Sequence, residues 1–158
     1  MIKETLKFKT KWKAIVRDAK TGEVIRETEF KNAVLDQWRE RIANALYGEL
    51  DELGDTIDDL KAKLYLKYEQ LGTDDTTAVS TDTDLITEDA GTLKQIASLS
   101  RDGAEVTILS FWDDGEAIGN WREFALYTED MMAVVRANIE QDIANGETLT
   151  IEGKIKQE

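Results

Sequence analysis

The chain of 158 residues contains no cysteine, no histidine and no proline. Without cysteine there is no disulfide, no thiolate nucleophile and no cysteine metal site. Without histidine the commonest general base and the commonest transition-metal ligand are missing, which excludes serine–histidine and cysteine–histidine catalysis. Only carboxylates, lysine, tyrosine or a hard metal ion remain to support catalysis. We therefore expect a protein that is not an enzyme and that needs no cofactor.

Long hydrophobic runs are also missing. No apolar stretch approaches the roughly 18 residues that suggest a membrane span, and the polar segment 1–5 lacks the apolar core of a signal peptide. The composition, 41% hydrophobic and 34% charged, is typical of a globular protein. The length suits one domain, and no repeat or linker divides it. We expect a single domain over 1–158, synthesised in a cytoplasm and without a membrane partner.

Charge of one sign dominates, with 33 acidic and 20 basic residues and a net charge of −13. The balance is +4 over residues 1–48, −10 over 49–91 and −7 over 92–158. A strongly negative protein is a poor candidate for non-specific nucleic-acid binding. The simplest interpretation of the charge is solubility. The alternative is that the basic N-terminal strand and the acidic middle of the chain meet across subunits.

The N-terminal segment predicts a β-hairpin. Over residues 5–17 apolar and basic side chains alternate, a period of two that is typical of a half-buried strand. One face of this strand is cationic and consists of Lys7, Lys9, Lys11, Lys13 and Arg17. A turn over 18–22 and a second strand through 24–30 complete the hairpin.

An amphipathic helix is predicted over about 33–48. Asn32 is a suitable N-cap, and Leu35, Trp38 and Ile42 recur at steps of three and four residues. The helix should end near Gly48, and its apolar stripe should face the core.

An acidic insertion follows near 49–63. Its apolar residues Leu50, Leu53, Ile57 and Leu60 have the spacing of a coiled-coil seam, although the stretch is short and glycine weakens it. Three interpretations stay open: a helix or acidic loop packed on its own domain, a helical contact between subunits, or a mobile loop. These four residues, with Lys7, Lys9, Lys11 and Lys13, form the candidate interface.

The rest of the chain reads as short strands separated by turns. Strands are expected over 64–71, 92–101, 104–112, 121–128, 132–140 and 147–156, with a long surface loop over 72–84. Asp102-Gly103 is a strong hairpin signal. The predicted fold class is mainly β, an antiparallel sandwich or barrel-like domain with one helix after the N-terminal hairpin.

Three groups of residues are candidate sites of chemistry. Asp74, Asp75, Asp82 and Asp84 supply oxygens that calcium prefers, but their spacing does not match an EF-hand, and a solvated loop is the favoured interpretation. Asp113, Asp114 and Glu116 read as a plain turn rather than an acid–base pair. Trp12, Trp38, Trp112 and Trp121 occupy positions typical of a core or an interface rather than of a sugar platform.

The order of four segments resembles small virion proteins and tail-fibre N-terminal domains of tailed bacteriophages. The segments are Phe30-Lys31-Asn32-Ala33-Val34 before the helix, Leu71-Gly72-Thr73-Asp74-Asp75-Thr76-Thr77 with Asp82-Thr83-Asp84-Leu85-Ile86-Thr87-Glu88, then Glu116 to Tyr127, and finally Val135-Arg136-Ala137-Asn138-Ile139 with the closing strand Leu149 to Ile155. The resemblance spans about residues 5–156. The chain departs from the pattern because its loop lacks a proline and because 49–62 looks like an insertion.

The resemblance implies a structural protein of the virion that binds other copies of itself and other virion proteins, is assembled in the host cytoplasm and has no catalytic residue. A tail-associated role in a fibre, a baseplate or an adaptor is expected first. A head decoration protein that stabilises the capsid is the alternative. A carbohydrate-binding attachment module that uses Trp112, Trp121 and nearby acids is a second alternative.

Overall fold

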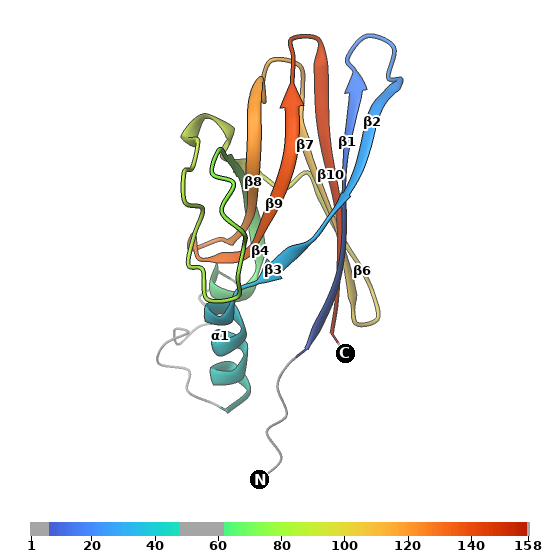
Figure 1. Cartoon of the computed structure of the whole chain (residues 1–158). Helices are drawn as coiled ribbons and strands as arrows, with labels where there is room; N and C mark the ends of the chain where they lie inside the picture. Colours follow the sequence, from blue (N-terminus) through green and yellow to red (C-terminus); the bar gives the residue numbers. More distant parts are fainter. Residues whose placement is uncertain (1–6, 48–61, 158) are drawn as a thin grey trace.

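The computed structural model describes residues 7–47 and 62–157, which form a sandwich of two antiparallel five-stranded sheets (Figure 1). The first sheet has the strand order β2 (Val24–Phe30), β1 (Phe8–Asp18), β10 (Glu147–Gln157), β7 (Glu105–Trp112) and β6 (Ser98–Asp102). The second has the order β3 (Asn32–Val34), β9 (Ala133–Ile143), β8 (Gly119–Thr128), β4 (Leu66–Gly72) and β5 (Lys94–Gln95). The mainly β prediction is confirmed as a sandwich, and the sheets do not close into a barrel.

The N-terminal hairpin forms as predicted. β1 pairs with β2 on one side and with β10 on the other, and its alternation places Trp12, Ala14 and Val16 in the core. The connecting turn is fixed by Asp18, whose carboxylate accepts hydrogen bonds from the backbone N–H groups of Lys20 and Thr21. Because side chains alternate between the two faces of a strand, the lysines of β1 lie on the face opposite to Trp12, Ala14 and Val16 and point away from the core.

The prediction for the start of the helix is wrong. Helix α1 covers Asp36–Tyr47, and the segment predicted as its first turn forms strand β3. Asn32 is not a helix cap: its side chain accepts a hydrogen bond from Thr10 Oγ1. β3 pairs with Val135–Ala137 of β9, so sheet formation overrides the helical spacing of this segment.

The predicted strand over 92–101 is interrupted. A single 3₁₀ turn covers Ala90–Thr92, and the chain then forms β5 and β6 on either side of Ile96 and Ala97. β5 belongs to the second sheet and β6 to the first, so the interruption is where the chain crosses between the two layers.

The core lies between the sheets and contains large aromatic side chains. The Trp112 and Phe124 rings meet edge-on with their centroids 6.3 Å apart, and the Trp12 ring also contacts Phe124, at a centroid distance of 5.8 Å. The Trp12 ring lies over Gly153 of β10, where a Cβ atom would be 2.1 Å from Trp12 Cζ3. The glycine is needed because the indole occupies the place of its side chain. Among the described residues, no helix is long and apolar enough to span a membrane.

The outer faces of the two sheets differ. Over the second sheet lies the segment 73–89, which buries a small apolar cluster that includes Leu85, Tyr127 and Leu35. No described helix or loop lies over the outer face of the first sheet (Figure 1). One sheet is therefore covered by its own chain and the other is left open.

Candidate functional site

A buried ion pair lies beneath the segment 73–89, on the outer face of the second sheet. Glu123 of β8 and Arg136 of β9 are both fully buried. Arg136 Nε donates to Glu123 Oε2 at 3.0 Å, and Arg136 Nη2 is 2.9 Å from the same oxygen. Such two-point contacts between a guanidinium and a carboxylate are among the stronger polar interactions in proteins.

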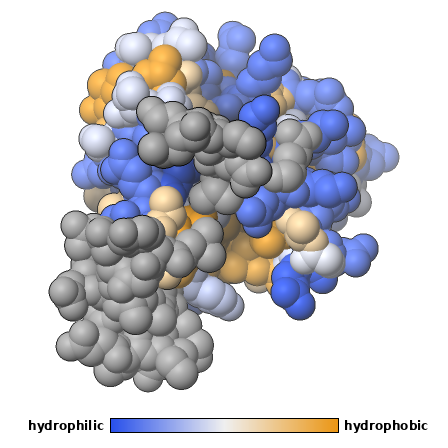
Figure 2. Space-filling model, turned by 90° about the horizontal axis from the view of Figure 1, so that it is seen from below, coloured by the Kyte–Doolittle hydropathy of each residue, from blue (hydrophilic) through white to orange (hydrophobic). Residues whose placement is uncertain are grey.

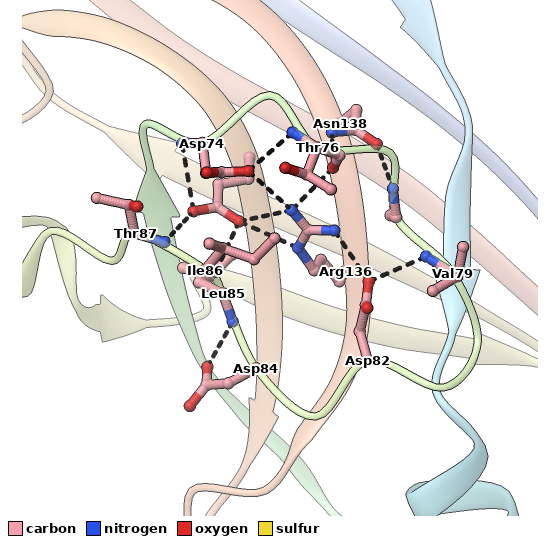
Figure 3. Close-up of polar contacts among 12 residues, drawn as sticks. Asp74, Thr76, Val79, Asp82, Asp84, Leu85, Ile86, Thr87, Arg136 and Asn138 are labelled. Carbon is pink, nitrogen blue, oxygen red and sulfur yellow. Dashed lines mark hydrogen bonds and ion pairs between the residues drawn. The ribbon is translucent and has the colours of Figure 1, made fainter.

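The remaining polar atoms of this pair hold the loop (Figure 3). Arg136 donates to the Thr76 carbonyl at 3.0 Å and to Asp82 Oδ2 at 2.9 Å. The Glu123 carboxylate accepts from the backbone N–H groups of Ile86 at 3.0 Å and Thr87 at 2.7 Å. Asn138 adds two contacts, because its amide nitrogen donates to the Thr76 carbonyl and its oxygen accepts from the Ala78 N–H. The two ends of the loop are thus fastened to neighbouring strands, and we call this group the loop clamp.

The loop clamp has a structural role rather than a chemical one. Both of its charges are buried, and hydrogen bonds from the loop satisfy them, which is the condition under which a buried ion pair is tolerated. Glu123 has no free lone pair directed at a substrate, since Arg136 and the loop backbone use both oxygens. The arrangement can fix the loop over the sheet, and it offers no general base or nucleophile.

Sequence reasoning did not find the loop clamp. Glu123 and Arg136 each lie in a segment of the phage-like pattern, Glu116 to Tyr127 and Val135 to Ile139, but neither is predicted as a site residue. The available signal was a charge within each of two mostly apolar strands: Glu123, which follows Arg122 in 121–127, and Arg136 in 133–139. Charged residues are almost never fully buried unless they are paired, so the two charges predict each other.

The four aspartates that are candidate calcium ligands belong to the loop, and three of them make contacts that hold it in place. Asp82 is bound to Arg136 and accepts from the Val79 N–H, and Asp84 accepts from the Tyr127 hydroxyl at 2.6 Å. Hydrogen bonds from Thr76 lower the pKa of Asp74. Asp75, the fourth, is exposed. Among the described residues, no three acidic side chains are grouped so that they could hold a metal ion.

The acidic turn after β7 is held together by its own side chains. Glu116 accepts from the Asp113 N–H at 2.8 Å and pairs with Lys94 at 2.6 Å, and the hydrogen bond from Lys94 lowers the pKa of Glu116. Asp114 accepts from the N–H of Gly146, in the turn between β9 and β10. These carboxylates are engaged as turn residues, in agreement with the favoured interpretation.

A second buried carboxyl lies inside the sandwich. Glu69 of β4 is fully buried and faces Ser110 of β7. Burial raises the pKa of Glu69 to about 8, although the Ser110 hydroxyl and the Phe111 backbone act in the opposite direction. Neither carboxyl oxygen makes a hydrogen bond of good geometry. At neutral pH this group is therefore mostly protonated and uncharged.

The tryptophans are core residues. Trp12, Trp112 and Trp121 are buried, and Trp38 is half-buried against Phe8. The Trp112 indole N–H donates to the Thr92 carbonyl inside the protein. Because a sugar stacks on an exposed ring face, Trp112 and Trp121 cannot form the platform that the carbohydrate-binding alternative requires.

The predicted interface lysines lie together on the open face of the first sheet. Lys7, Lys9 and Lys11 are exposed, and Lys13 is half-buried. Lys13 pairs with Glu152 at 3.2 Å, whereas the contact of Lys11 with Glu29 is 3.9 Å long and highly exposed. Exposed pairs of this kind contribute less than about 1 kcal/mol. This cationic surface thus remains available to a partner.

The register between β1 and β10 concentrates the positive charge further. Lys9 lies directly opposite Lys156, and Lys11 lies directly opposite Lys154. Like charges that face each other across strands destabilise a sheet. Lys154 pairs with Glu105 at 3.1 Å, whereas Lys9 and Lys156 form no ion pair among the described residues. We call Lys7, Lys9, Lys11, Lys154 and Lys156 the lysine face.

The other half of the predicted interface is not described by the structure, because Leu50, Leu53, Ile57 and Leu60 lie outside the described residues.

Comparisons of the chain with family models, curated proteins and solved structures found no match.

Proposed function

We propose that the chain is a non-enzymatic structural protein of a tailed-phage virion, associated with the tail, that acts by self-assembly and by contacts with other virion proteins. The virion placement is supported by how the segments that resemble phage proteins come together. The Gly-Thr-rich loop, the strand that contains Glu123 and the strand that contains Arg136 all contribute to the loop clamp. Their order in the sequence thus corresponds to one structural unit.

The lysine face is the single observation that carries the proposal of assembly. Pairs of lysines in direct register cost stability in the isolated molecule, and an anionic surface laid against them would remove that cost. The chain as a whole has a net charge of −13, so its residues outside the lysine face carry an excess of negative charge. A second copy can therefore supply the anionic surface.

The residues that define the lysine face are all charged, so a contact there would depend on charge more than on apolar burial. Figure 2 views the end of the molecule at which β1 begins and β10 ends, and the described surface there is mainly hydrophilic, with small separate hydrophobic areas. Charge complementarity of this kind contributes specificity and register more than bulk affinity.

Light scattering of the purified chain tests the assembly. Raising the salt from about 0.1 M to about 1 M shortens the range of exposed charge interactions from about 10 Å to about 3 Å. We expect an oligomer at low salt that dissociates, at least in part, at high salt. The double substitution Lys9→Glu with Lys156→Glu should abolish the oligomer, whereas Lys20→Glu, in the β1–β2 turn, should not. A monomer at every concentration and both salts would contradict self-assembly through the lysine face.

A further inference from the structure

One edge of the second sheet is only partly paired. β3 covers β9 at Val135–Ala137 alone, because the chain passes from β2 in one sheet to β3 in the other (Figure 1). Beyond this point no described strand pairs with β9 on that side. At the far end, the Asp142 carbonyl accepts a hydrogen bond from Arg26. The stretch Asn138–Gln141 is therefore a short free strand edge, and such edges are ready templates for another strand.

A groove runs beside this free edge. It has a volume of about 470 Å³ and lies between β2 and β9, with Asp75 of the clamped loop at its border. Its apolar lining comes from Phe30 and Ile139. A β-strand that was added to β9 would place alternate side chains toward this lining.

Two features of the groove indicate the chemistry of its ligand. Gln141 is 1% exposed and lines the groove, yet its Oε1 atom has no hydrogen-bond donor. Asp75 and Glu140 also line it, and neither carboxylate has an ion-pair partner among the described residues. The cation of the groove, Arg122, is already bound to Asp142 at 2.9 Å. The lining thus carries three carboxylates, Glu29, Asp75 and Glu140, against one guanidinium, so the groove has a net negative charge that a basic ligand would complement.

We propose that this groove binds an extended, basic segment of a partner protein, which adds to β9 as an additional strand. Backbone hydrogen bonds to Asn138–Gln141 provide the pairing. Apolar side chains of the segment contact Phe30 and Ile139, and lysine or arginine side chains pair with Asp75 and Glu140. The site does not depend on the virion placement or on the lysine face.

Two synthetic hexapeptides test the proposal, one of alternating lysine and valine and one of alternating glutamate and valine. Backbone amide NMR of the full chain would follow each titration. We expect the lysine peptide to shift the amide signals of Asn138–Gln141 and to slow their hydrogen exchange. The substitution Glu140→Lys should weaken this binding by about tenfold, equivalent to about 1.4 kcal/mol. Glu40→Lys, the same change on an exposed residue of α1, should leave it unchanged.

Several results would overturn the proposal. Equal binding of the glutamate peptide would remove the charge recognition, and shifts that map to the edges of β2 or β6 would place strand addition elsewhere. Absence of any shift at about 1 mM peptide, where binding of about −4 kcal/mol is detectable, would remove the site. Concentration-dependent shifts of the same amides without peptide would replace the basic partner with a second copy of the chain.

Discussion

The buried carboxyl of Glu69 should make the stability of the protein depend on pH, and the substitution Glu69→Gln tests this directly. Glutamine has nearly the shape of a protonated glutamate and cannot ionise. In the folded protein burial raises the pKa of Glu69 from an ordinary value of 4.5 to about 8. The folded state therefore retains a proton that the unfolded chain releases between these two values.

The sign and size of the effect follow from linkage. A group whose pKa is raised on folding stabilises the protein fully below its unfolded pKa, and this stabilisation is lost as the pH rises through its folded pKa. The shift is roughly 3.5 pH units, and each unit corresponds to about 1.4 kcal/mol, so the free energy of unfolding should fall by on the order of 5 kcal/mol between about pH 4.5 and about pH 8. The carboxyls whose pKa is lowered, such as Asp74 and Glu116, act below this window.

Urea unfolding followed by tryptophan fluorescence is a suitable assay, because three of the four tryptophans are buried. Measured from about pH 5 to about pH 9, the wild type should lose several kcal/mol of unfolding free energy. Glu69→Gln should lose little, and its advantage over the wild type should grow as the pH rises. Glu140→Gln, which removes an exposed carboxylate, serves as the control and should follow the wild type. Equal slopes for the wild type and Glu69→Gln would refute the reasoning.

Three further substitutions test the packing. Arg136→Met leaves the Glu123 charge buried without its partner and should lower the free energy of unfolding by about 3–5 kcal/mol. The loop over 73–89 should also be cleaved faster by a protease. Wild-type stability of this variant would contradict the loop clamp. Gly153→Ala places a Cβ against the Trp12 ring and should cost about 1–3 kcal/mol by urea unfolding, so an unchanged midpoint would count against this contact. Met131 has a φ of 65°, in the left-handed region that asparagine tolerates better than methionine. Met131→Asn should therefore raise the free energy of unfolding by up to about 1 kcal/mol. A lower melting temperature of this variant would contradict the prediction.

Much of the fold could be predicted because local patterns determine it. The alternation over 5–17 and the turn over 18–22 were sufficient for the hairpin, and the turn signal at Asp102-Gly103 correctly separated β6 from β7. The start of the helix could not be predicted in this way. Three residues are too few to show a strand period, and only the pairing of β3 with β9 decides their conformation.

The loop clamp shows a different limit of the sequence. A long polar loop was predicted over 72–84, and this part of the chain is indeed irregular. The sequence does not show that the loop lies across a sheet, since that depends on which strands Glu123 and Arg136 occupy and on their register. The lysines were recognised as one face of a strand, but their direct opposition to Lys154 and Lys156 required the pairing of β1 with β10.

The most direct test of the proposed function is to locate the chain in assembled particles. Tailed-phage particles from cells that produce the chain would be purified and separated into heads and tails, and the chain would be quantified in each fraction by mass spectrometry. The proposal predicts a fixed number of copies per particle, retained with the tails. Enrichment in the heads would contradict the tail placement and favour the decoration role, and absence from the particles would contradict a virion structural protein altogether.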